Sequence, residues 1–187
     1  GIYRDVTQRK NLERELQRLA TTDMLKGIAN RRAFLECAES AYAHSRSNGE
    51  PLPLLMLDLD HFKTINDRFG HLEGDRALMA FAQAIKGQLR ASDAVGRLGG
   101  EEFGVLLPVT TLAEGLEVAT RMLHSIRALE LMDDAGHSYR VTTSLGVSNF
   151  RQSDRSLRDM LDRADQALYL AKHRGRNQVA SLETLGE

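Results

Sequence analysis

The sequence has no tryptophan, one cysteine and three prolines among its 187 residues, and neither charge is in excess. A single cysteine, Cys37, excludes an intrachain disulfide. Aromatic residues make up 5% of the chain, which leaves little material for the stacking platforms of single-strand binders. The 25 basic residues balance 26 acidic ones, so a basic footprint for a nucleic-acid backbone is missing. We therefore expect no polynucleotide partner.

Long apolar segments are missing as well. No stretch resembles a signal peptide or reaches the roughly 20 apolar residues of a membrane-spanning helix. We expect a cytoplasmic domain without membrane contact from this segment; a longer protein that carries it can still be tethered to a membrane elsewhere. Hydrophobic residues at 42% and charged residues at 27% are typical of a globular fold. The length suits one domain of about 150 residues with some connecting sequence.

The first twenty residues differ in character from the rest. Residues 4–10 are polar, and Leu12, Leu16 and Leu19 follow at spacings of four and three. This pattern predicts a short amphipathic helix. Such a helix either pairs with the same helix of a second chain or lies on its own domain, and the spacing alone favours neither.

From residue 21 onward, helical and strand patterns alternate. Helices are predicted over residues 30–44, 76–89, 112–129 and 156–173, a polar and partly helical segment over 62–69, and strands over 53–60, 94–98, 102–107, 139–147 and 178–182. This order predicts an α+β domain with a ferredoxin-like architecture, in which helices flank a mixed, mostly antiparallel sheet. Gly99 and Gly100 lie between two apolar strands and predict a tight β-hairpin whose turn residues need positive φ.

Carboxylates gather at the end of the first predicted strand. Asp58 and Asp60 project from one face of an otherwise apolar segment. They need a bound cation or a raised pKa, or they cap the following turn. If the hairpin pairs beside this strand, its tip brings Glu101 and Glu102 to the same place. Hard oxygen ligands suit Mg²⁺ or Mn²⁺ and not zinc.

The segment Gly99-Gly-Glu-Glu-Phe103 resembles the signature of the GGDEF-family diguanylate cyclases in its Glu variant. The resemblance extends from Asp23 to about Leu182 through ordered blocks at residues 23–32, 58–67, 70–75, 97–103, 144–147, 163–169 and 171–177. It implies a nucleotidyl-cyclase-type fold. It also implies an enzyme that condenses two GTP molecules into cyclic di-GMP and releases two pyrophosphates.

The resemblance further implies roles for individual residues. Asp58, Glu101 and Glu102 would bind Mg²⁺ or Mn²⁺ with Leu59 as a further contact, and Glu102 is a candidate to help deprotonate the attacking hydroxyl. The backbone from Leu59 through Phe62 to Lys63 would present N–H groups to the terminal phosphates. The remaining substrate positions are Lys63, Lys172 and Arg176 at the phosphates, Asn66 and Asp75 at the guanine, and Gly99 and Gly100, which allow close approach of the nucleotide.

Several of these residues have a plainer interpretation. Lysines and arginines usually belong to a solvated surface, and any hairpin can use a glycine turn. Asp75 could cap a helix that starts near Arg76. The ordered blocks favour the nucleotide-binding interpretation for Lys63, Lys172 and Arg176.

A second site is implied by Arg90 and Asp93, which are similar to the family's inhibitory product site, with Arg121 at the position of its additional arginine. The alternative is an arginine in the last turn of a helix followed by a polar turn. Lys26 departs from the family, which usually has Thr there. Residues 1–10 resemble the last strand and exit helix of a PAS sensor domain. We therefore assign residues 1–20 to the end of a sensor domain and a linker helix, and 21–187 to the GGDEF domain.

Because cyclic di-GMP has two-fold symmetry, we expect a homodimer with one GTP in each subunit. A non-catalytic module that binds GTP or cyclic di-GMP is the alternative. Its expected mark would be a broken hairpin motif or the loss of Asp58, and the sequence has neither. A structural dimerisation element is a third hypothesis.

Overall fold

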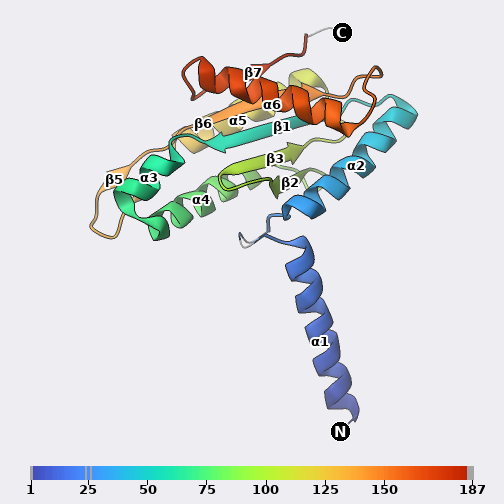
Figure 1. Cartoon of the computed structure of the whole chain (residues 1–187), viewed down its shortest axis with the longest axis vertical. Helices are drawn as coiled ribbons and strands as arrows, with labels where there is room; N and C mark the ends of the chain where they lie inside the picture. Colours follow the sequence, from blue (N-terminus) through green and yellow to red (C-terminus); the bar gives the residue numbers. More distant parts are fainter. Residues whose placement is uncertain (1, 24, 26, 185–187) are drawn as a thin grey trace.

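The computed structural model describes residues 2–23, 25 and 27–184, with the backbone alone for residues 2–5 and 18–20. The helices are α1 (Ile2–Thr21), α2 (Arg31–Asn48), α3 (Phe62–Phe69), α4 (His71–Lys86), α5 (Leu112–Arg127) and α6 (Leu157–His173). The strands are β1 (Pro53–Leu59), β2 (Ala94–Arg97), β3 (Glu102–Leu106), β4 (Leu131–Met132), β5 (Ser138–Tyr139), β6 (Thr143–Asn149) and β7 (Val179–Ser181). Figure 1 shows how these elements are arranged.

A five-stranded sheet in the order β2-β3-β1-β6-β7 forms the centre of the domain. The central strand β1 pairs antiparallel with β3 and β6, β2 pairs antiparallel with β3, and β6 and β7 form a parallel pair. Strands β4 and β5 form a separate two-stranded sheet. The predicted α+β fold with a mixed, mostly antiparallel sheet is confirmed.

Both faces of the sheet are covered, which explains why β1 is apolar almost throughout. Leu55 and Leu57 pack with buried residues of α4 and α5, whereas Leu54 and Met56 pack with those of α2 and α6. Side chains alternate between the faces of a strand, so Asp58 shares the face of Leu54 and Met56, toward α2 and α6. Figure 1 shows α6 lying across β1.

Some predicted ends of helices and strands are confirmed, and others differ by several residues. Asn30 caps α2 as expected, because its side-chain oxygen accepts a hydrogen bond from the Ala33 amide at 2.9 Å. Helix α4 begins at His71 instead of Arg76, since Gly70 ends α3 and leads directly into α4. The alternative role of Asp75 as a helix cap is therefore wrong. Strand β6 begins at Thr143 instead of Tyr139, which belongs to β5.

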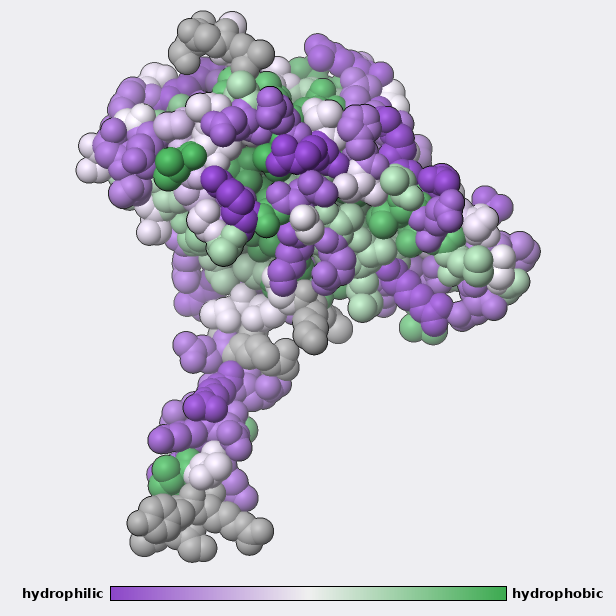
Figure 2. Space-filling model, turned by 180° about the vertical axis from the view of Figure 1, so that it is seen from behind, coloured by the Kyte–Doolittle hydropathy of each residue, from purple (hydrophilic) through white to green (hydrophobic). Residues whose placement is uncertain are grey.

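Helix α1 projects away from the domain as a single helix (Figure 1). The strand expected at the start of the chain is therefore wrong from Ile2 onward. Leu12 and Leu16 are 63% and 59% exposed, so α1 does not lie on its own domain. Figure 2 shows a mainly hydrophilic helix surface with isolated hydrophobic side chains. The side chain of Leu19 and all of Lys26 lie outside the described residues.

None of the helices among the described residues combines the length and the hydropathy that crossing a bilayer requires.

Candidate active site

Asp58 lies near the end of β1, and the residue is 7% exposed. The ammonium of Lys172, on α6, donates a hydrogen bond to its Oδ2 atom. Its Oδ1 atom is buried and has no hydrogen-bond partner among the described residues. Burial raises the pKa of Asp58, Lys172 partly offsets this rise, and the charges of Glu101 and Asp60 add to it. Asp58 therefore has one buried acceptor oxygen that receives no hydrogen bond from the described residues.

The β2–β3 hairpin brings its acids beside Asp58. Glu102 is the register partner of Asp58 on the neighbouring strand, and the Leu59 amide donates to the Glu101 carbonyl at 3.3 Å. Burial raises the pKa of the half-buried Glu102, and the charge of Asp58 raises it further. The prediction that the hairpin pairs beside the first strand is confirmed, and the three acids are neighbours.

The predicted metal ligands are adjacent but do not form a closed cluster. Across the described residues, no three His, Cys, Asp or Glu side chains are grouped so that they could hold an ion together. Lys172 instead compensates the charge of Asp58. The unpaired Oδ1 of Asp58, next to two further acids, nevertheless provides the hard oxygen donors that Mg²⁺ and Mn²⁺ prefer. The residues present fit such an ion.

The glycines of the hairpin turn do not have the positive φ that the sequence predicts, because the described glycines with positive φ are Gly27, Gly49, Gly70, Gly136 and Gly175. The turn is instead held by arginines. The Arg97 guanidinium donates to the carbonyls of Gly99 and Gly100, and Arg31 donates to the Leu98 carbonyl at 3.0 Å.

Nor does packing within the chain require these glycines. A Cβ added at Gly100 would meet no atom within 4 Å, and one at Gly99 would meet only the Cβ of Glu102, at 3.9 Å. Backbone conformation and internal packing therefore leave the choice of glycine unexplained at both positions. Close approach of a ligand to the hairpin backbone remains as a reason for glycine at these two positions.

The segment after Asp58 turns sharply into α3. His61 has a left-handed conformation, with φ of 57°, and α3 begins at Phe62 without a side-chain cap. The first amides of a helix have no partner within it, so Phe62 and Lys63 present N–H groups at this end. Lys63 is exposed, and Leu59 is buried just before the turn. The amides of Leu59 and Asp60 donate to the carbonyls of Glu101 and Thr142, so the predicted presentation of the Leu59 N–H group to the phosphates is wrong.

Asn66 and Asp75 lie on the two helices that follow, α3 and α4. A Cβ added at Gly74 would lie 1.8 Å from the Asn66 Oδ1 atom, so the absence of a side chain at Gly74 lets Asn66 pack against α4. The Asn66 Oδ1 atom is buried and lacks a hydrogen-bond partner in the described part of the chain. Asp75 is exposed and directly follows Gly74. Asn66 therefore contacts the residue that directly precedes Asp75, at the junction of α3 and α4.

Asp60 has a different role from Asp58. Its carboxylate accepts hydrogen bonds from the hydroxyls of Ser144 and Thr142, each at 2.7 Å, and from the Asn177 amide at 3.1 Å. The last bond fastens the loop after α6, where Arg176 and Asn177 both have left-handed backbone conformations. Asp60 is thus a structural anchor for the loop that carries Arg176, a role that the sequence pattern did not assign.

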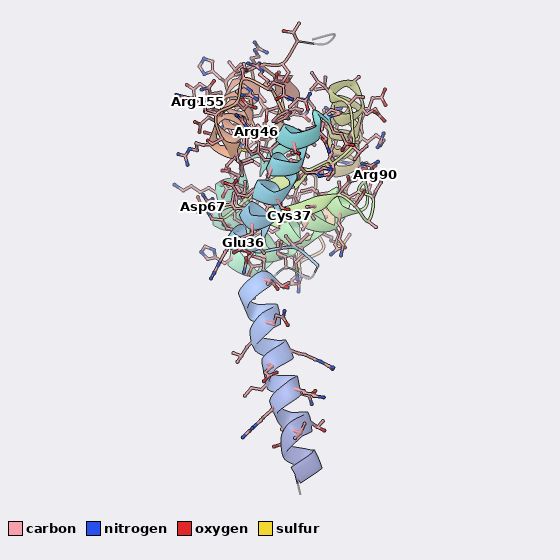
Figure 3. All side chains as sticks on the ribbon, turned by 90° about the vertical axis from the view of Figure 1, so that its right-hand side faces the viewer. Glu36, Cys37, Arg46, Asp67, Arg90 and Arg155 are labelled. Atoms are coloured by element: carbon pink, nitrogen blue, oxygen red, sulfur yellow. The ribbon has the colours of Figure 1, made fainter. Side chains whose placement is uncertain are left out.

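Arg90, Asp93 and Arg121 line one cavity of about 150 Å³ between the segment after α4 and helix α5. Arg90 pairs with Asp93 at 3.1 Å and donates to the Pro108 carbonyl and the Thr110 hydroxyl, at 2.9 and 2.7 Å. Figure 3 shows Arg90 on the opposite side of the domain from Asp67 of α3. This cavity is therefore separate from the junction of α3 and α4.

Comparisons with known proteins identify the family to which this chain belongs. The family described as diguanylate cyclase, GGDEF domain, matches residues 20–178, so the chain belongs to the GGDEF family. The resemblance seen in the sequence is confirmed at the level of the family. Diguanylate cyclase DgcP of Pseudomonas aeruginosa is 41% identical over 169 residues, which are 90% of this chain and 25% of that protein. The chain spans less than half the length of these and other curated relatives that it matches.

Solved structures agree with the family assignment. The coiled coil and GGDEF domain of DgcB from Caulobacter crescentus, in complex with c-di-GMP, matches with a TM-score of 0.90 and 28% identity, covering 95% of this chain and 94% of that one. The active GGEEF domain of a diguanylate cyclase from Vibrio cholerae matches with a TM-score of 0.77 and 30% identity, covering 83% and 97%. The second structure is described as a GGEEF domain, and GGEEF is also the sequence of residues 99–103 here.

Proposed function

We propose that this chain is a diguanylate cyclase domain, which condenses two GTP molecules into cyclic di-GMP and releases two pyrophosphates. The observation that carries the proposal is the unsatisfied Oδ1 atom of Asp58 beside Glu101 and Glu102, at the strand end where the hairpin signature lies. In each of two steps a 3′-oxygen bonds to the α-phosphorus of the other GTP. The bond from that phosphorus to the pyrophosphate leaving group breaks.

Asp58, Glu101, Glu102 and the Leu59 backbone would hold the divalent cation, Mg²⁺ or Mn²⁺. When bound, such a cation neutralises phosphate charge and lowers the pKa of the attacking hydroxyl. The raised pKa of Glu102 suits a carboxylate that accepts the proton from this 3′-hydroxyl. Lys172 lies beside Asp58, where it can contact the triphosphate once its bond to Asp58 is exchanged.

The other contacts to the nucleotide would come from the ends of three helices. The amides of Phe62 and Lys63 at the start of α3, together with the side chains of Lys63 and Arg176, would bind the phosphates. Asp75 can accept hydrogen bonds from guanine N1–H and N2–H, a donor pair that adenine lacks, and Asn66 would complete the base site. Gly99 and Gly100 would let the nucleotide approach the hairpin backbone.

In the proposed reaction each domain binds one GTP, so two copies of the domain must associate to condense two GTP molecules. We assign residues 1–20 to a linker helix from an upstream sensor domain, and residues 21–187 to the catalytic domain. The exposed Leu12 and Leu16 on α1 suit pairing with a second copy. The similar DgcB structure is described as a coiled coil with a GGDEF domain, which supports this assignment. Because GTP is a cytoplasmic nucleotide, we place the domain in the cytoplasm.

Product inhibition is the second part of the proposal. The cavity between Arg90, Asp93 and Arg121 would take the phosphates and guanine faces of cyclic di-GMP, since guanidinium groups suit both. The DgcB domain was solved in complex with c-di-GMP, which supports an affinity of this fold for the product.

The test is incubation of the chain with GTP and Mg²⁺, followed by chromatography of the nucleotides. Cyclic di-GMP is the expected product. GTP that binds but stays unchanged would instead support a non-catalytic binding module. No binding of GTP would leave a structural dimerisation element.

A further inference from the structure

Glu73 is a buried acid on the first turn of α4, outside the carboxylates at the end of β1. Its side chain is 6% exposed. The hydroxyl of Tyr139, on β5, donates a hydrogen bond to Glu73 Oε1 at 2.5 Å, and Arg76 lies 3.5 Å from Oε2. The tyrosine is thus the close hydrogen-bond donor of this buried carboxylate. A buried carboxylate that loses such a donor is destabilised in its charged form.

Tyr139 also touches the preceding helix. Its ring stacks on Phe69, the last residue of α3, with ring centroids 4.6 Å apart and an interplanar angle of 20°. One side chain therefore contacts the end of α3 by stacking and the start of α4 by a hydrogen bond. Arg76 makes a further link, because it pairs at 2.6 Å with Asp134 in the loop between β4 and β5. The β4–β5 hairpin fastens the α3–α4 elbow, by which we mean residues 66–75.

The same elbow carries the two residues proposed to bind guanine. Asn66 packs against Gly74 so closely that a Cβ there would lie 1.8 Å from its Oδ1 atom. Gly74 separates Glu73 from Asp75, so a shift of the first turn of α4 moves Asp75 relative to Asn66. The position of Glu73 therefore sets the spacing between the two predicted base contacts.

We propose that Tyr139, acting through Glu73, is a positioning residue for guanine recognition: it fixes the α3–α4 elbow so that Asn66 and Asp75 match the edge of the base. This inference rests on the proposed function only in assigning guanine to the elbow. Burial and the neighbouring Glu73 raise the pKa of Tyr139, so the phenol keeps its proton and stays a donor across the working pH range.

The experiment measures binding of an unreactive GTP analogue with a methylene group between the α and β phosphorus atoms, by titration calorimetry in the presence of Mg²⁺. Tyr139→Phe keeps the stacked ring and removes only the hydroxyl. We expect it to weaken binding about 10-fold, in line with the loss of a hydrogen bond to a charged group. Tyr169→Phe is the matched control, because Tyr169 is 65% exposed on α6, and it should bind like the parent chain.

A second measurement separates positioning from a general loss of structure. The same analogue with hypoxanthine lacks the N2 amino group, so it reports on the contact to Asp75. Tyr139→Phe should reduce the preference for guanine over hypoxanthine, and in turnover it should raise KM while kcat at saturation is unchanged. Glu73→Gln keeps an acceptor for Tyr139 and should retain most of the preference, whereas Glu73→Leu should lose it.

The outcomes distinguish this inference from the proposed function. If Tyr139→Phe or Glu73→Leu weakens both analogues equally or leaves both unchanged, the positioning role is wrong even where the parent chain makes cyclic di-GMP. If the parent chain makes no product but shows the expected loss of base preference in the variants, the inference stands and the catalytic proposal falls. If the parent chain does not bind the guanine analogue, both are overturned.

Discussion

Asp58 and Asp60 stand two residues apart at the end of one strand and have different surroundings. Three hydrogen bonds, from Ser144, Thr142 and the Asn177 amide, satisfy Asp60. Asp58 has Lys172 on one oxygen and no hydrogen-bond partner, among the described residues, on the other. A buried charge with an unsatisfied oxygen is a local destabilisation, and such groups gather at functional sites.

This difference predicts that Asp58→Asn stabilises the chain. The pKa of Asp58 is raised in the folded state above its usual 3.8. A raised pKa means that the folded state binds the proton more tightly, so stability falls as the pH rises from 3.8 through the folded value. At pH 7 without nucleotide or added metal, Asp58→Asn should therefore gain on the order of 1 kcal/mol in the free energy of unfolding.

Thermal melting measured from pH 3 to pH 8 tests this prediction. The gain should disappear below the unfolded pKa, where Asp58 is protonated in both states. Asp67→Asn is the control, because Asp67 is exposed on α3. A lower Tm for Asp58→Asn than for the parent chain at pH 7 would show that the ion pair with Lys172 outweighs the burial.

The sequence could place both acids at a strand end but could not separate their roles. The partners of Asp60 come from β6, from the residue just before it and from the loop after α6, more than 80 residues further along the chain, and only the fold brings them together. Glu73 and Tyr139 were missed for the same reason, because they are 66 residues apart and belong to no local pattern. The neighbourhood of Asp58 and Glu102 was predictable, since it needs only two adjacent strands.

At the scale of elements, local patterns gave some boundaries well. The segment 62–69, predicted to be partly helical, is helical throughout as α3, and the N-cap of α2 is the predicted Asn30. Strands β4 and β5 have two residues each, too few for any periodicity to reveal. The start of α4 was placed too late because Gly70 and Gly74 suggest a loop, whereas Gly74 is helical and makes room for Asn66.

The β2–β3 hairpin yields a prediction about its glycines. The φ of Gly100 is not positive, and a Cβ added there would meet no atom within 4 Å. Gly100→Ala should therefore leave the free energy of unfolding within about 0.5 kcal/mol of the parent. If the glycine exists for the nucleotide, the same variant should raise KM for GTP. Denaturant unfolding and steady-state kinetics measure the two effects.

Gly146→Ala provides the opposite comparison. A Cβ there would lie 2.2 Å from the Ala164 carbonyl oxygen on α6, so this variant should lose about 1–3 kcal/mol of stability by overpacking. A Gly100→Ala variant that is clearly destabilised, or that keeps the parent KM, would remove the functional reason for that glycine.

At the scale of the whole molecule, the projecting α1 is the main feature without an intramolecular role. Leu12 and Leu16 are exposed, so the double change Leu12→Glu and Leu16→Glu should not alter the Tm of the domain. It should weaken self-association and lower the specific activity at low protein concentration, with recovery at high concentration. Analytical ultracentrifugation and rates across protein concentrations measure both effects. Unchanged association in the variant would exclude α1 as the pairing surface.

The proposed activity depends most on the carboxylates that β1 and the β2–β3 hairpin bring together. The most direct test is the formation of cyclic di-GMP from GTP and Mg²⁺ by Glu101→Ala, compared with the parent chain and with Glu36→Ala, a change at an exposed position on α2. Removing a group that stabilises charge in the transition state lowers turnover by about 10²-fold or more. We predict that loss for Glu101→Ala and parent-like activity for Glu36→Ala. Retained synthesis by Glu101→Ala would contradict the assignment of the metal site.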